Sequence, residues 1–263
     1  MDDDVARGPT RGTGRGREYR PGRGLADAQK NDLEPWLEPP WVIPPAADAA
    51  VVAAMESTLD TYAEPHDSSR PVACVDEGGK QLTGELREPL PVRPGSPAKE
   101  DYEYERGGVA NLFLAFEPLA GWRHVEVTQR KTSIDFARFL QALSDDHYPT
   151  AETVVSVLDN LSTHPPAALY EAFEPAEARR LAERFAWRYT PTHGSWRTVA
   201  ECELSVLARP CLDRRIPDIE TVRREVAAWE KDRTAAAVAV DWQFTTADAR
   251  VRLKKLYPAT QPQ

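Results

Sequence analysis

The sequence predicts an α/β fold: a mixed sheet flanked by helices, with the first three strands antiparallel and the later strands parallel. Two observations support this prediction. The strand-like segments 110–116 and 122–128 are joined by a short connection, which is typical of an antiparallel hairpin. Beyond them, apolar strand-like runs alternate with segments of helical spacing. Such alternation is typical of parallel strands that helices cover on both faces.

The N-terminal part of the chain is expected to precede the sheet. Residues 1–30 are rich in Gly and Arg, lack apolar periodicity and predict a disordered leader. Residues 31–70 predict a proline-rich linker, whose Trp36 and Trp41 are more typical of packing anchors than of a base-stacking platform, and then a helix over 48–62. The folded domain is expected over 71–257, followed by a tail of 258–263.

Within this domain the first strand is expected to end at Asp76, because the double glycine at 78–79 is typical of a turn. The proline-rich stretch 80–106 predicts an irregular excursion before the hairpin. The later elements are predicted from apolar spacing. In order they are a helix over 133–143, a strand over 153–159, helices over 167–173 and 175–184, a strand over 185–191, and helices over 196–208, 219–230 and 246–257.

Composition excludes several classes of protein. No run approaches the ~20 apolar residues of a membrane helix, and the first residues resemble no targeting signal, so we expect a cytoplasmic protein without a membrane partner. The three cysteines show no metal-binding spacing. A net charge of −9 opposes nucleic-acid binding, although basic residues cluster over 179–188, 214–224 and 250–255. Each of these clusters is also what a solvated helix face looks like.

Three acidic residues stand in separate local patterns. Asp76 and Asp159 are expected at the ends of buried strands and Glu201 on a helix. Converging carboxylates of this kind suit two Mg²⁺ ions and phosphodiester chemistry, since Mg²⁺ prefers oxygen ligands. Without metal such acids would repel one another, which predicts a partly protonated site. Each has another reading: either aspartate could form only a turn or a helix cap, and Glu203 competes with Glu201 as the third acid.

Further polar and aromatic residues lie beside these acids in the sequence. His164 could contact phosphate or metal-bound water, or could act only as a packing or capping group. His193 could lie near the same site or in a turn. The complete set of candidate accessory residues is Glu77, Asn160, His164, His193 and Trp196.

The motifs VDE, LDNLSTH and HGSW, followed by a glutamate and ELSVL, resemble those of DDE transposases of the mariner superfamily, most closely bacterial insertion-sequence family 630. The resemblance covers about 33–257. It implies an RNase H-like fold with Asp76, Asp159 and Glu201 as catalytic residues and metal ligands. It also implies two Mg²⁺ ions, with Mn²⁺ as a substitute, and DNA element ends and target DNA as partners of a homodimer. Glu201 is preferred to Glu203 because the family's third acid follows the polar residue at the start of the helix, here Thr198, by three positions.

The chain departs from this family in two places. Arg197 and Thr198 stand where Leu-Asn is usual, so we expect a change at the start of the third acid's helix. The family places helix-turn-helix modules before the catalytic domain, and residues 1–30 have no such periodicity, so we expect a truncated copy without its DNA-binding region, located at the nucleoid when active. Two alternatives are a stand-alone metal-dependent nuclease of the same fold and an inactive remnant acting as an interaction protein.

Overall fold

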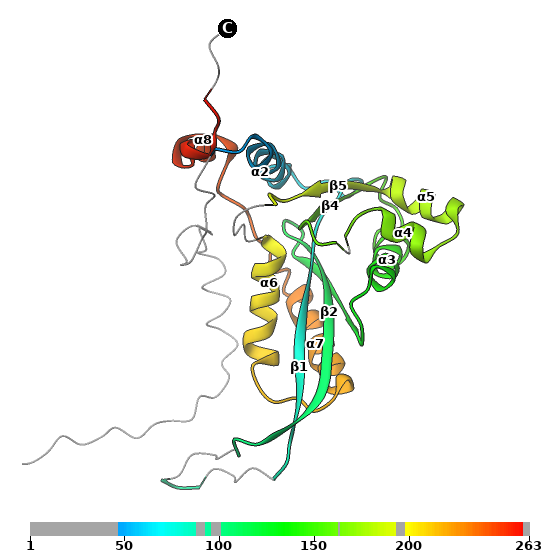
Figure 1. The fold of residues 1–263 in the computed structure, drawn as a ribbon, viewed down its shortest axis with the longest axis vertical. Coiled ribbons are helices and arrows are strands. Elements are labelled where there is room, and N and C mark those ends of the chain that lie inside the picture. Colours follow the sequence, from blue (N-terminus) through cyan, green and yellow to red (C-terminus); the bar gives the residue numbers. More distant parts are fainter. Residues whose placement is uncertain (1–46, 88–92, 96–100, 163, 193–197, 260–263) are drawn as a thin grey trace, which may run out of the picture. The chain divides into compact units, whose positions relative to one another are not determined.

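The computed structural model describes residues 47–87, 93–95, 101–162, 164–192 and 198–259. These residues form a five-stranded sheet with the order β3-β2-β1-β4-β5 (Figure 1). Its strands are β1 (Val72–Glu85), β2 (Tyr104–Glu117), β3 (Trp122–Thr128), β4 (Val154–Leu158) and β5 (Phe185–Tyr189). β1, β2 and β3 pair antiparallel, whereas β4 pairs parallel with β1 and with β5. The predicted fold class, an RNase H-like mixed sheet, is therefore confirmed.

The prediction that the first strand ends at Asp76 is wrong. β1 continues without a turn through Gly78 and Gly79 to Glu85, and these glycines pair with Leu112 and Asn111 of β2. The stretch predicted to be irregular contributes Lys80–Glu85 to β1 and the first residues of β2. The physical reason is the long antiparallel ladder, because hydrogen bonds to β2 satisfy the backbone of a segment whose own sequence favours a turn.

The predicted β2–β3 hairpin is confirmed, with β2 longer than expected at its N-terminal end. Its connection requires glycine at position 121. Gly121 has φ +65°, and a Cβ there would lie 2.6 Å from the backbone carbonyl carbon of Ala237. This close approach lets the segment after α7 (Ile219–Ala235) pack on the turn, where Val240 donates a backbone hydrogen bond to the carbonyl of Pro118 (N···O 2.8 Å).

Helices cover both faces of the sheet (Figure 1). The helices on one face are α3 (Ser133–Ala142), which runs into a π-helical turn (Leu143–His147), α4 (Ala167–Ala172) and α5 (Pro175–Arg184). Those on the other are α2 (Ala49–Tyr62), α6 (Val199–Leu207) with a π-helical turn (Ala208–Leu212), α7, and α8 (Thr246–Arg252) with a 3₁₀ turn (Lys254–Leu256). The predicted helices thus form, but α7 extends five residues beyond the expected end at Glu230, and the last α-helix ends before the expected Tyr257.

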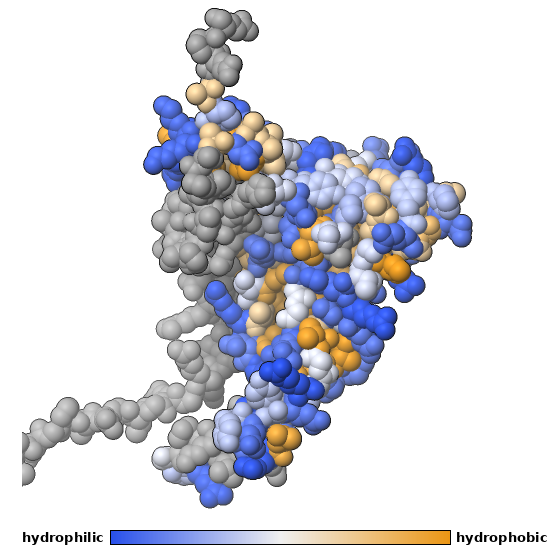
Figure 2. Space-filling model, in the orientation of Figure 1, coloured by the Kyte–Doolittle hydropathy of each residue, from blue (hydrophilic) through white to orange (hydrophobic). Residues whose placement is uncertain are grey.

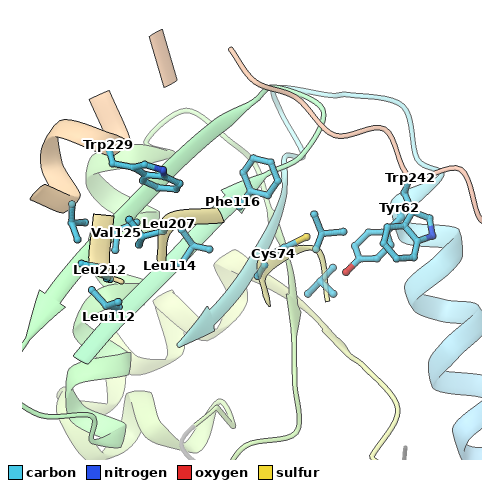
Figure 3. Close-up of a cluster of buried hydrophobic side chains, with 14 of the residues drawn as sticks. Tyr62, Cys74, Leu112, Leu114, Phe116, Val125, Leu207, Leu212, Trp229 and Trp242 are labelled. Atoms are coloured by element: carbon cyan, nitrogen blue, oxygen red, sulfur yellow. The ribbon is translucent and has the colours of Figure 1, made fainter. Parts of the chain in front are cut away.

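Two hydrophobic cores follow from the alternation of side chains along the strands. Cys74 of β1 belongs to the core beneath α2, α6 and α7, whereas Val75 belongs to the core beneath α3, α4 and α5. Figure 3 shows the first core, with Trp229 of α7 beside Phe116 and Leu114 of β2. At its other end the rings of Tyr62 and Trp242 lie side by side, with centroids 5.2 Å apart.

Several predicted features lie outside the described residues. These are the leader 1–30, the linker residues Trp36 and Trp41, the candidate site residues His193 and Trp196, and the last residues of the tail. Among the described residues, every helix is too short or too polar to cross a lipid bilayer.

Candidate active site

Asp76 and Asp159 are brought to the same region of the sheet by the parallel pairing of β1 with β4. Cys74 is in register with Val157, so that two residues further along each strand the chain reaches Asp76 and Asp159. Carboxyl ends of adjacent parallel strands lie side by side, about 4.8 Å apart. Asp159 follows the last residue of β4, as the sequence predicts, whereas Asp76 lies inside β1.

The Asp76 carboxyl group is strongly perturbed by its surroundings. It is 7% exposed, and its Oδ1 accepts a hydrogen bond from the Glu77 N–H (2.7 Å). Burial, together with the negative charges of Glu201 and Asp159, raises the pKa of Asp76 to about 7. The charges of Glu201 and Asp159 therefore both reach Asp76, and the expectation of a partly protonated metal-free site agrees with this shift for Asp76.

Glu201 lies in the first turn of α6, where it forms a reciprocal capping box with Thr198. The Thr198 hydroxyl accepts from the Glu201 N–H (3.0 Å), and the Thr198 N–H donates to Glu201 Oε2 (3.2 Å). Threonine is a favourable N-cap residue, like the asparagine that the family resemblance implies. The expected change at the start of this helix is therefore wrong for Thr198, while Arg197 lies outside the described residues.

Glu203, the rival third acid, occupies a different environment. It is buried on the sheet side of α6, where its Oε1 lies 2.8 Å from Arg123 Nε and 2.9 Å from Arg233 Nε. Both of its carboxylate oxygens are engaged by arginine, since Oε2 accepts from Arg233 as well (3.2 Å). This pairing gives Glu203 a structural role and leaves Glu201, on the exposed side of the helix, as the acid beside Asp76.

His164 connects the second acid to β1. Its ring is fully buried, with Nδ1 2.6 Å from Asp159 Oδ1 and Nε2 2.6 Å from Glu77 Oε2. Lys131 pairs with the other oxygen of Glu77 (2.9 Å), and the Phe136 ring packs on the imidazole (centroids 4.6 Å apart). The histidine thus does more than pack or cap, because it spans two carboxylates that belong to neighbouring strands.

The charges of this cluster reinforce one another. Burial alone would lower the pKa of His164, but the carboxylates of Asp159 and Glu77 raise it to about 9. Burial alone would likewise raise the pKa of Glu77 and of Asp159, yet His164 lowers both, with help from Lys131. At neutral pH the cluster therefore consists of an imidazolium held between two carboxylates.

A pH-dependent stability follows from the His164 shift. The pKa of His164 is about 9 in the folded protein and about 6.5 in the unfolded chain, so its stabilising contribution is complete below about pH 6.5 and is lost as the pH rises through about 9. The loss should be on the order of 3 kcal/mol, at roughly 1.4 kcal/mol per pKa unit.

Urea unfolding in the presence of a chelator measures this effect. The free energy of unfolding of the wild-type chain minus that of His164→Gln is expected to fall steadily between about pH 6.5 and 9. A difference that stays constant over this range would show that the imidazole is not charged by its two carboxylates.

The remaining predicted accessory residue within the described chain is Asn160. Its side-chain amide donates to the carbonyl of Thr190, which ties the segment after β4 to the end of β5. Lys131 is a contact that the sequence analysis missed. It directly precedes Thr132, the N-cap of α3, and no local pattern distinguishes it from other surface lysines.

The donor chemistry of this region fits a hard divalent cation, because it consists of carboxylate oxygens. Asp76 also lacks a direct cationic partner among the described ion pairs, so that a cation would favour its ionised form. As they stand, however, no three described His, Cys, Asp or Glu side chains are grouped so that they could hold a metal ion. Glu201 Oε2 is engaged by its own helix cap, and Asp159 Oδ1 by His164 and by the Leu161 N–H (3.0 Å).

Comparison with known families assigns most of the folded part of this chain to one family. Residues 71–223 match the DDE superfamily endonucleases, and this segment spans β1 to the first part of α7 and includes all three acids. The chain belongs to this family of endonucleases. The family resemblance read from the motifs is thereby confirmed at the level of the DDE superfamily. No curated protein matches the chain.

Several solved structures are similar to this DDE endonuclease chain. The Mos1 mariner paired end complex with Mn is 14% identical to this chain, with a TM-score of 0.46, and the match covers 76% of this chain and 61% of the Mos1 chain. The same complex with Mg is 16% identical and covers 84% and 66%, with a TM-score of 0.48. The Mos1 strand transfer complex is 16% identical and covers 81% and 65%, with a TM-score of 0.45. The chain thus spans under two thirds of the length of these transposase chains.

Proposed function

We propose that this chain is the catalytic part of a transposase of insertion-sequence family 630, which cuts the DNA ends of a mobile element and transfers them to target DNA. The observation that supports this most directly is that Asp76 and Asp159 each lie two residues beyond a paired position of parallel strands, and that the charges of Asp159 and Glu201 both act on the buried Asp76 carboxyl group. Membership of the DDE endonuclease family supplies the reaction class. DNA as substrate and a homodimer as the active assembly belong to the same proposal.

In this proposal Asp76, Asp159 and Glu201 are the residues that would hold two divalent ions. The ions, when bound, supply Lewis-acid stabilisation and a nucleophile at neutral pH. His164 orients Asp159 through its 2.6 Å contact, and Glu77 fixes the imidazole from the other side. Because Glu201 Oε2 takes part in the capping box and no three described acids are grouped for a metal, we expect the ligand set to assemble when the metal binds.

Incubation of the chain with supercoiled plasmid DNA tests the proposal. We expect strand cleavage with Mg²⁺ or Mn²⁺ and none with a chelator. With a substrate that carries the element ends, we also expect covalent joining of a DNA 3′-hydroxyl to target DNA. Cleavage without joining would favour the stand-alone nuclease. Absence of both, with the metal bound to the chain, would leave only the interaction protein.

A further inference from the structure

An open groove runs along β1 and α6, starting two residues beyond Asp76 in the strand and one helical turn beyond Glu201 in the helix. We call it the β1–α6 groove, and its volume is about 560 Å³. The residues of the lining that matter most are Gly78, Gly79, Lys80, Leu204, Ser205 and Arg209. Figure 2 shows apolar atoms between α6 and β1 on this face, surrounded by hydrophilic residues.

The groove is continuous with the candidate active site. Asp76, Gly78 and Lys80 occupy alternate positions of β1 and therefore share one face of the strand. Glu201 and Ser205 are four residues apart on α6 and share one side of the helix. The acids consequently lie at one end of the groove and the two cations, Lys80 and Arg209, lie further along it.

The lining leaves room for a linear ligand between these two ends. Gly78 and Gly79 expose strand backbone without side chains, and a Cβ at Gly78 would already contact Leu204 at 3.7 Å. Leu204 adds an apolar contact on the helix side, and Ser205 turns its hydroxyl back to the Glu201 carbonyl (3.0 Å). This lining combines exposed backbone, an apolar side chain and charged groups, which suits a chain with a polar backbone and flat apolar groups.

The charges of the groove favour an anionic ligand. Arg209 is exposed and forms no ion pair with any residue in the described ranges. Lys80 donates through Nζ to the carbonyl of Arg214 (2.6 Å), which leaves its positive charge uncompensated by direct contact. Asp213 also lines the groove, so the ionised lining side chains sum to one positive charge in a protein whose net charge is −9.

We propose that the β1–α6 groove receives the DNA strand that adjoins the phosphate to be cut, with Lys80 and Arg209 contacting backbone phosphates and Leu204 contacting a base. The inference rests on the proposed function for the identity of the ligand. Phosphate contacts by lysine and arginine supply most of the affinity of such binding, whatever the DNA sequence.

The salt dependence of DNA binding tests this assignment. The double variant K80Q/R209Q is compared with R179Q/K255Q, which removes the same charge from exposed positions on α5 and the 3₁₀ turn after α8. Binding of a single-stranded oligonucleotide of mixed sequence is measured in a chelator at several salt concentrations, so that cleavage does not interfere. Each lost phosphate contact should reduce the slope of log K against log salt by about 0.7, or roughly 1.4 for the double variant.

The outcomes separate the groove from the catalytic proposal. If the salt slope of K80Q/R209Q equals that of the control, the proposal that the groove binds DNA is wrong, even if the wild-type chain cuts DNA. A reduced slope in a chain that never cuts DNA supports the groove and contradicts the proposed function. Because glutamine could perturb the fold, thermal unfolding of both variants is measured as well. The variant Ser205→Phe, which fills the groove without changing charge, is expected to weaken binding while leaving the salt slope near that of the wild type.

Discussion

Replacing Asp76 with asparagine is expected to abolish metal-dependent DNA cleavage and, at the same time, to stabilise the metal-free protein above about pH 7. Under the proposed function Asp76 is a metal ligand, and loss of such a ligand removes several kcal/mol of transition-state stabilisation, equivalent to roughly a thousandfold or greater loss of rate. Asparagine can still accept the hydrogen bond from the Glu77 N–H. The lost activity would therefore reflect the missing charge and not a collapsed strand.

The gain in stability follows from the sign of the Asp76 shift. Burial and the charges of Glu201 and Asp159 raise the pKa of this carboxyl from 3.8 to about 7, so its neutral form is favoured in the folded chain. An acid raised in this way loses stabilising free energy as the pH rises from about 4 through 7, in total on the order of 4 kcal/mol. The asparagine variant has no such loss, so its advantage should be absent near pH 4 and complete above about pH 7.

Urea unfolding of both chains across this pH range, with and without Mg²⁺, measures the effect. Asp232→Asn is a matched control, because Asp232 is exposed on α7. Mg²⁺ should stabilise the wild-type chain by roughly 2.7 kcal/mol at a hundred times its Kd, and should leave Asp76→Asn unchanged. An asparagine variant that still cuts DNA with Mg²⁺ would remove Asp76 from the catalytic set.

Substitution of Glu203 should mainly lower the stability of the chain, whereas substitution of Glu201 should mainly abolish DNA cleavage, although the two residues lie on the same helix. Removal of the Glu203 carboxylate is expected to destabilise the chain by about 3–5 kcal/mol, since it leaves the buried Arg123 guanidinium without its counter-charge. Arg123 is packed between the rings of Phe116 (4.9 Å) and Trp229 (5.9 Å) and donates to the carbonyl of Val238 (2.6 Å). Its side chain is fully buried, so the guanidinium is not in contact with solvent.

Denaturant unfolding of Glu203→Gln and Glu201→Gln separates the two roles. Glutamine can replace glutamate in a capping box, so Glu201→Gln should cost about 1 kcal/mol at most while abolishing cleavage. The double variant R123M/E203M should be more stable than Glu203→Gln alone, because it also removes the fully buried charge of Arg123 and leaves only the partly exposed Arg233 without this carboxylate. Equal losses of stability in the two single variants would contradict the assignment of Glu203 to the core.

Local sequence patterns predicted most elements of this fold because the relevant forces are local. The helical spacing in 133–143 and the β-branched run ending at Leu158 are confirmed as α3 and β4. The errors occur where long-range pairing overrides local preference. Gly78 and Gly79 favour a turn by themselves, but the ladder with β2 holds them in an extended strand.

The residues of the candidate site likewise differ in whether local sequence patterns could predict them. The three acids could be proposed from motifs, because each lies in a distinctive local pattern. The link from His164 to Glu77 could not, since these residues are 87 positions apart and a histidine before two prolines has many local explanations. The same is true of Lys131, whose only distinguishing feature is the carboxylate that it contacts.

The sequence by itself determined the α/β class of the chain, the order of its strands and helices from the hairpin onward, and which acids are candidates for metal chemistry. The family motif already favoured Glu201 over Glu203 as the third acid, and only the tertiary structure shows how the surroundings of these two residues, two positions apart on α6, differ. That separation rotates a side chain about halfway around a helix, so one glutamate points into the arginine-lined core and the other stays exposed on the side of Asp76. The burial of each glutamate and the charges around it depend on residues remote in the chain, such as Arg123 and Arg233. Local sequence patterns do not reveal these contacts.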